Sequence, residues 1–222
     1  MILQLSLIEG RAYEMAHSAK SFEPWVAWRP CEPATAELAF SRMKARLPVL
    51  FGSSALISAR DSTLPFYREH ELVELVINRQ HNATNVYLLH GDRRTGWLAG
   101  TSAPIHAINN FESLELTDAT AESYLRFFLC FLQADDGFFE LTESAEEFPD
   151  VPGDSPEVMA KRAALREALL PLRGEGVEDE RWIFRGTVAY QGWLYGARFS
   201  VDRIGEVTME DDEPLVTSRP QL

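Results

Sequence analysis

Basic residues and cysteines are scarce in this sequence. Its 222 residues include 21 Lys and Arg against 34 Asp and Glu, which gives a formal net charge of −13 at pH 7. Binding to phosphates requires clustered Lys and Arg, so this balance argues against nucleic acid and anionic membrane surfaces as partners. Cys31 and Cys130 are too few for a disulfide framework, which is typical of a protein from a reducing compartment. We therefore expect a cytoplasmic protein.

Long apolar runs and targeting signals are missing as well. The unbroken apolar segment Phe127–Leu132 is much shorter than the ~18 residues of a membrane span. Residues 1–16 have no positively charged region ahead of their apolar residues, so no signal peptide is expected. These absences predict a soluble chain with no membrane association.

The common catalytic and cofactor motifs are absent too. The sequence contains no glycine-rich phosphate loop, no HExxH zinc motif, no GxSxG nucleophile turn and no CxxC pair. We therefore expect neither a cofactor nor a metal ion.

An apolar stretch over 117–142 organises the predicted fold. A buried helix is expected over 118–134, because Arg126 is the only polar residue between Tyr124 and Leu132. Its apolar positions form two stripes, so it must be covered on two sides. The second stripe contains Phe127 and Phe131. Its cover is the helix after Ser155, the N-terminal helices or a second copy of the chain, which would make a homo-oligomer.

The C-terminal part reads as an antiparallel meander over 181–210. Aromatic and β-branched residues alternate with polar ones along two segments that are joined by a Gln191-Gly192 turn. The alternating residues are Trp182, Phe184, Val188, Tyr190, Trp193, Tyr195, Ala197, Phe199 and Val201. A third strand is expected over 206–210, and residues 211–222 are expected to fray as a polar tail.

Short strands are predicted over 86–116. Val86–His90 and Trp97–Thr101 form a hairpin around a polar loop bounded by glycines, and residues 105–109 and 111–116 continue as short alternating pieces. The sequence thus predicts an α+β fold, in which an antiparallel sheet (86–116 and 181–210) packs on the central helix 118–134.

Helices are expected before and after these strands. One runs over 36–47 behind a Thr35 cap, and another begins at Ser155-Pro156. Segment 66–77 has helical spacing, although Leu72–Val76 fits a strand equally well. We expect residues 1–60 to be an N-terminal helical and extended segment packed on one α+β domain, residues 61–222.

The best polar group for chemistry is formed by His90, Asp92, Arg94 and His106, on or beside neighbouring predicted strands. Two imidazoles and a carboxylate can hold a divalent metal, and a His–Asp pair can act as a general base. In the simpler interpretation, Asp92 and Arg94 shape a hairpin loop and the histidines are hydrogen-bonded surface residues. Without motif spacing, the simpler interpretation is favoured.

Aromatic residues mark a second candidate surface, for a partner or a pocket. It consists of Trp25, Trp28, Trp182, Trp193 and Tyr195. If these side chains faced solvent they would form a binding patch. Alternation along the meander instead favours packing of the last three against a core.

Two functions remain open at this stage. The first is a non-enzymatic binding or adaptor protein with a basic protein partner, because an acidic surface accelerates association with basic partners. The alternative is a hydrolase-like, small-molecule-binding enzyme with a pocket between the sheet and the central helix, which would use His90, Asp92 and His106.

Overall fold

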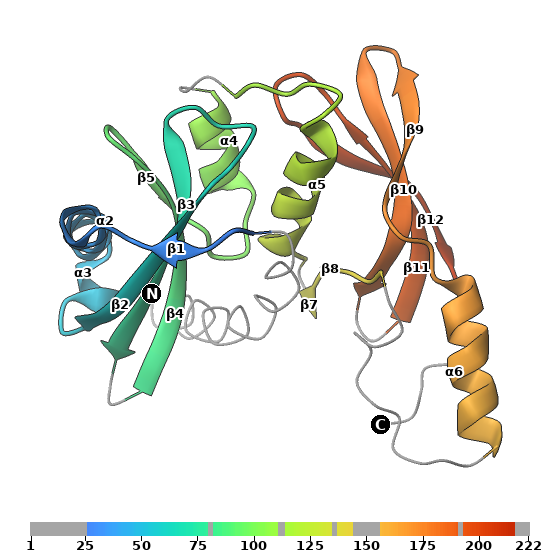
Figure 1. Cartoon of the computed structure of the whole chain (residues 1–222), viewed down its shortest axis with the longest axis horizontal. Coiled ribbons are helices and arrows are strands. Elements are labelled where there is room, and N and C mark those ends of the chain that lie inside the picture. The colour runs from blue at the N-terminus through green and yellow to red at the C-terminus, as the bar shows by residue number, and fades with distance from the viewer. Residues whose placement is uncertain are drawn as a thin grey trace. The chain divides into compact units, whose positions relative to one another are not determined.

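The computed structural model describes residues 26–79, 82–110, 114–134, 137–143, 156–190 and 193–215. The chain has an α+β fold with two five-stranded antiparallel sheets, which confirms the predicted class (Figure 1). It divides into two compact units, Met1–Glu115 and Leu116–Leu222, here called the N-terminal and the C-terminal unit. The boundary expected between residues 60 and 61 falls within strand β2 (Ala55–Thr63), which is paired along its length with β3.

The N-terminal unit is built on an antiparallel sheet in which sequential strands are neighbours. The strand order is β1 (Arg29–Pro30), β2, β3 (His70–Arg79), β4 (Asn82–Gly91) and β5 (Thr95–Trp97). A hairpin is present near its predicted place as β4 and β5, but its second strand is Thr95–Trp97 and not the expected Trp97–Thr101, because the turn is shorter than the predicted loop 91–96.

Helices α2 (Pro33–Arg46) and α3 (Pro48–Phe51) cover one face of this sheet (Figure 1). Pro33 occupies the first turn of α2, where its missing N–H costs nothing, and Pro48 prevents α2 from continuing. The core below these helices consists of aliphatic and aromatic side chains. Its buried members are Ala39, Phe40, Met43, Leu50, Phe51, Val73, Leu75, Ile77, Val86 and Leu88.

Two segments of this unit differ from a predicted structure. Of the helix over 66–77 and the strand over Leu72–Val76 that the sequence left open, the strand is present: His70–Arg79 is β3, which pairs with β2 on one side and β4 on the other. Its β-branched residues fit a strand that is buried on both faces. Such a strand is apolar at nearly every position, so apolar residues also occur at the spacing of a helix. Residues 105–109 are not a strand but belong to helix α4 (Ala103–Asn109), with Pro104 in its first turn.

The C-terminal unit contains the predicted meander. Its main sheet has the order β12-β11-β10-β8, and β9 also pairs with β10. The bounds are β8 (Glu140–Leu141), β9 (Arg173–Glu178), β10 (Arg181–Tyr190), β11 (Trp193–Val201) and β12 (Val207–Pro214). A small two-stranded sheet, β6 (Gln133–Ala134) with β7 (Gly137–Phe138), and helix α6 (Pro156–Ala168) complete the unit.

The register of the meander confirms the alternation read from the sequence. The alternating aromatic and β-branched residues predicted for β10 lie opposite apolar residues of β11, so both strands present one apolar face. The cross-strand pairs are Trp182–Val201, Phe184–Phe199, Val188–Tyr195 and Tyr190–Trp193.

The predicted central helix is α5 (Ala121–Cys130), shorter than the expected 118–134. Polar bonds tie it to its own unit: the Trp182 indole N–H donates to Asp118, and the Tyr124 hydroxyl donates to the Gly205 carbonyl. Phe127 and Phe131 are 0% and 1% exposed. Both side chains of the second apolar stripe are therefore buried within the chain itself.

None of the helices in the described part of the chain has the length and apolarity that a membrane crossing requires.

A glycine in β10 gives a test of the packing in this unit. A Cβ at Gly186 would lie 3.0 Å from Leu172 Cδ1 and 3.1 Å from its Cα, in the segment that crosses β10. We expect Gly186→Ala to lower the free energy of unfolding by about 1–3 kcal/mol, the usual cost of overpacking. Urea denaturation would measure it.

Gly174→Ala is the matched control, because its Cβ would come no closer than 3.8 Å to the Phe184 ring. This variant should stay within about 0.5 kcal/mol of wild type, as surface substitutions usually do. Equal stability of the two variants would show that Leu172 does not press on Gly186.

Candidate functional site

The loop between β4 and β5 is held by arginines of α2. Arg42 donates to the carbonyl oxygens of Gly91, at 2.7 Å, and of Asp92, while Arg46 donates to that of Thr95. The carboxylate of Asp92 lies on the exposed part of this loop. The predicted site residues His90 and Asp92 are therefore placed at one end of the N-terminal sheet by a helix that grips the loop backbone.

His90 is buried at the end of β4, with 6% of its surface exposed. Its Nδ1 is 2.8 Å from Thr95 Oγ1, across the hairpin. Burial lowers the pKa of His90, and the positive charges of Arg42 and His70 lower it further, against a smaller effect of Asp92. The ring is therefore neutral at pH 7.

His70 is a second buried histidine, and it was not among the site residues predicted from the sequence. It is 3% exposed, and neither ring nitrogen has a hydrogen-bond partner among the described residues. Its cross-strand neighbour is Gly91, where an added Cβ would lie 2.9 Å from His70 Nε2. Burial lowers the pKa of His70, and the charge of Arg94 adds to this against that of Glu69.

The two buried histidines do not form one site. His70 pairs with Gly91, so the neighbouring residue His90 points to the opposite face of the sheet. His106 lies half-buried on α4, a helix that packs over Gly96 of β5. Within the described ranges, no three His, Cys, Asp or Glu side chains are grouped as metal ligands.

A buried carboxylate lies on the same face of β3 as His70. Glu74, 3% exposed, forms an ion pair with Arg60 and accepts hydrogen bonds from the Tyr87 hydroxyl at 2.7 Å and the Asn85 amide at 3.0 Å. The Arg60 guanidinium also lies 4.4 Å over the Trp28 ring. Because the partners of this carboxylate lie on the two neighbouring strands, the cluster holds β2, β3 and β4 together. The carboxylate is engaged in these bonds and is not available as a general base.

The cysteines are unsuited to nucleophilic chemistry. Burial, followed by a hydrogen bond to Asp61, raises the pKa of Cys31 to about 12. Its thiol is therefore protonated at neutral pH, whereas a reactive cysteine needs a thiolate. Cys130 is buried in α5, and no disulfide joins the two cysteines.

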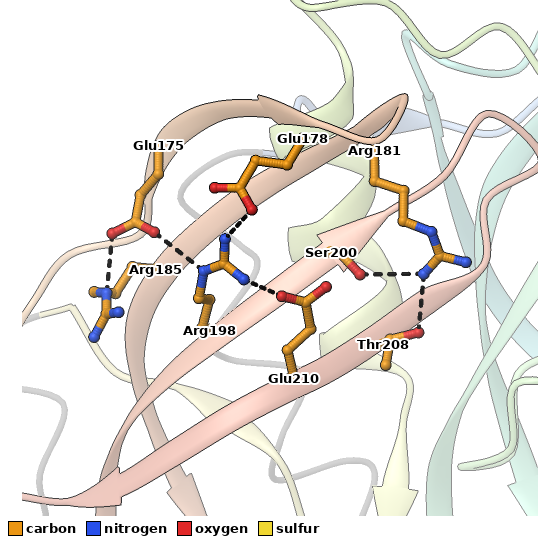
Figure 2. Close-up of polar contacts among 8 residues, drawn as sticks. All are labelled: Glu175, Glu178, Arg181, Arg185, Arg198, Ser200, Thr208 and Glu210. Atoms are coloured by element: carbon orange, nitrogen blue, oxygen red, sulfur yellow. Dashed lines mark hydrogen bonds and ion pairs between the residues drawn. The ribbon is translucent and has the colours of Figure 1, made fainter.

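The C-terminal sheet presents a polar face crossed by ion pairs (Figure 2). Arg185 and Arg198 are direct cross-strand partners on β10 and β11, a repulsive arrangement by itself. The carboxylate of Glu175 bridges them, 2.9 Å from Arg185 and 3.5 Å from Arg198. Arg198 also binds Glu178 at 2.7 Å and forms an ion pair with Glu210. We call these five residues the arginine cluster.

Strand β12 forms the open edge of this sheet. Among the described residues it pairs only with β11, and seven of its eight residues are exposed. Glu210 belongs to the arginine cluster, whereas Asp211, Asp212 and Glu213 have no ion pair within the described part of the chain. The sequence predicted that this strand ends at Glu210 and that a polar tail frays from Asp211, whereas β12 continues to Pro214.

The predicted aromatic surface is divided in the structure. Trp182 is buried and bonded to Asp118, while Trp193 and Tyr195 are half-buried on the apolar face of the meander. Trp28 is half-buried against Arg60, and Trp25 lies outside the described residues.

Comparison with known proteins gives no further guide: no protein family, curated protein or solved structure matches this chain.

The buried histidines predict a loss of stability in acid. Because burial holds the folded-state pKa of His70 and His90 below its unfolded value of ~6.5, the unfolded chain binds protons more readily. The stability from these neutral rings is complete above that value and is lost as pH falls through the lower folded pKa. We expect His70→Phe to reduce the loss of unfolding free energy between pH 7 and pH 5.

Urea titrations at several pH values would measure this effect. His106→Asn is the control, since it keeps both buried imidazoles and should retain the wild-type pH dependence. If His70→Phe and His106→Asn gave the same pH profile, protonation of His70 would not limit stability in acid.

The Glu74 cluster gives a prediction of its own. Glu74→Leu leaves the Tyr87 hydroxyl and the Asn85 amide without their acceptor, and should lower the free energy of unfolding by about 2–4 kcal/mol. Adding Tyr87→Phe should restore part of the loss, because it removes one orphaned hydroxyl. Chemical denaturation of both variants would measure this, and a double variant less stable than Glu74→Leu would contradict it.

Proposed function

We propose that this protein is a non-enzymatic binding protein of the cytoplasm whose C-terminal sheet recognises a basic protein partner. The observation that carries the proposal is the acidic, exposed edge strand β12. Its three free carboxylates, on Asp211, Asp212 and Glu213, stand next to each other on a strand whose neighbouring arginines are already engaged.

The charge around this strand supports the same partner. Residues 173–214 contain ten acidic and five basic residues, a net charge of −5, and four of those acids lie on β12. Such a surface attracts basic partners over a Debye length of about 8–10 Å at moderate salt. Two cysteines not joined by a disulfide agree with a reducing compartment.

The alternative, a hydrolase-like enzyme, has weaker support. It requires His90, Asp92 and His106 to act together, whereas His90 is engaged with Thr95 and Asp92 lies on an exposed loop. A general base must reach the proton that it abstracts. The neutral ring of His90 has suitable chemistry, but its burial does not favour access by a substrate.

Charge removal on β12 tests the proposal. We expect D211N/D212N/E213Q to lose most of its capture of basic proteins from a host lysate at about 50 mM salt, where exposed charges are weakly screened. Wild-type capture should itself fall strongly at about 500 mM salt. Quantitative mass spectrometry of the bound fraction would compare the proteins by isoelectric point.

The control variant E32Q/E37Q/E167Q changes net charge by the same amount at three exposed positions away from β12. It should bind like wild type. Equal loss in both triple variants would assign the effect to total charge, and capture of no basic protein at either salt would rule the proposal out.

A further inference from the structure

We propose that β12 binds its basic partner by strand addition: an extended segment of the partner joins the C-terminal sheet as a further antiparallel or parallel strand. This inference rests on the proposed function and specifies how the binding takes place. It is carried by the unpaired backbone of β12 and by the positions of its side chains.

The backbone of β12 supplies the docking groups. A strand pairs on both sides when neighbours are present, and β12 has only β11 among the described residues. Half of its N–H and C=O groups therefore point away from the sheet, over a length of eight residues. Strands of this length are long enough to bind an extended peptide by main-chain hydrogen bonds.

The open edges of the N-terminal sheet are shorter: beyond the residues that pair with β1 and β5, β2 has no second neighbour over 55–58 and β4 has none over 82–86 among the described residues. The sheet ends in β1, with two residues, and in β5, with three. Short end strands are a common way to prevent pairing with other chains. Of the two five-stranded sheets, only that of the C-terminal unit ends in a long strand in the described part of the chain.

The side chains of β12 indicate the sequence pattern of the partner. The register places Asp211 and Glu213 on the face of Arg198, and Asp212 and Met209 on the opposite face with Ala197 and Phe199. Met209 is 42% exposed. An added strand would place basic side chains beside Asp211 and Glu213, and apolar side chains beside Met209 at alternate positions.

The same charges disfavour a second copy as the occupant. β12 carries four acidic residues and no basic one, so pairing between two copies would place carboxylates against carboxylates. The arginine cluster does not offset this, because its arginines already bind Glu175, Glu178 and Glu210 (Figure 2). The carboxylates of β12 would attract a basic strand, whereas they would repel the β12 of a second copy.

Backbone methylation of a peptide tests strand addition separately from charge. The probe is a fluorescent eight-residue peptide of alternating Lys and Val. One derivative carries N-methyl groups on its Val residues and the other on its Lys residues, so that each blocks one edge of the extended peptide and both keep the charge. Fluorescence anisotropy with the full chain at about 50 mM salt would give the affinities.

If strand addition is correct, only the derivative methylated on the edge that faces β12 loses affinity. The loss should be about tenfold or more, from several missing hydrogen bonds. Amide hydrogen exchange of β12 should slow with the parent peptide, and D211N/D212N/E213Q should weaken its binding, whereas E32Q/E37Q/E167Q should not.

The two failures are distinct. Equal affinity of the two methylated derivatives, or unchanged amide exchange in β12 with peptide bound, would overturn strand addition and leave recognition of basic partners standing. No binding of any of the three peptides, together with no capture of basic proteins from lysate, would overturn both.

Discussion

The structure depends on how the unpaired backbone groups at the edges of its antiparallel sheets are protected from pairing with other chains. Every sheet that does not close into a barrel leaves a row of peptide N–H and C=O groups at each end, and these groups pair with any extended chain that fits. In the N-terminal unit the sheet ends in strands of two and three residues, and only short stretches of β2 and β4 beyond them lack a second neighbour in the described part of the chain. In the C-terminal unit β12 runs for eight residues along the edge. Charge is then the remaining means of deciding what may pair there.

Buried polar groups are treated differently in the two units. In the N-terminal unit, β3 carries Glu74 and His70 on one face; the first is bonded to residues of both flanking strands, and the second has no partner in the described ranges. A paired buried carboxylate stabilises one arrangement of strands, whereas an unpaired imidazole is tolerated only while it is neutral. Protonation of His70 in acid is therefore expected to destabilise the end of β3 near Gly91. In the C-terminal unit the arginine cluster lies on an exposed sheet face, where each ion pair contributes little, whereas the largely buried Arg126 is paired with Glu122 and Glu143.

Much of the fold could be predicted from the sequence where strands have one apolar and one polar face. The Trp182–Val201 pairing follows from the two-residue turn at 191–192 together with the alternation, because a slip of one residue would turn every aromatic side chain to the wrong face. The choice between helix and strand stayed open at residues 66–77, since a strand flanked by neighbours and buried on both faces loses its period of two. Prediction failed at Asp211–Pro214 for a different reason: acidic residues favour strands weakly, and pairing with β11 outweighs that preference. His70 was not selected as a site residue because its burial becomes visible only when β3 is known to be a strand.

The arginine cluster connects these features to the proposed binding surface. Arg198 binds Glu178 of β9 and Glu210 of β12, so one central side chain contacts strands on both sides of the β10–β11 pair. Glu210 lies at the irregularity in the register beside Arg198 and forms an ion pair with it. The next three acids continue along the strand without such a partner. Of these four acidic residues, Glu210 ties β12 to β11 through Arg198. Asp211, Asp212 and Glu213 are exposed to solvent. An edge built in this way repels its own copy and attracts a basic strand, which is the selectivity that a binding protein with an open sheet edge requires.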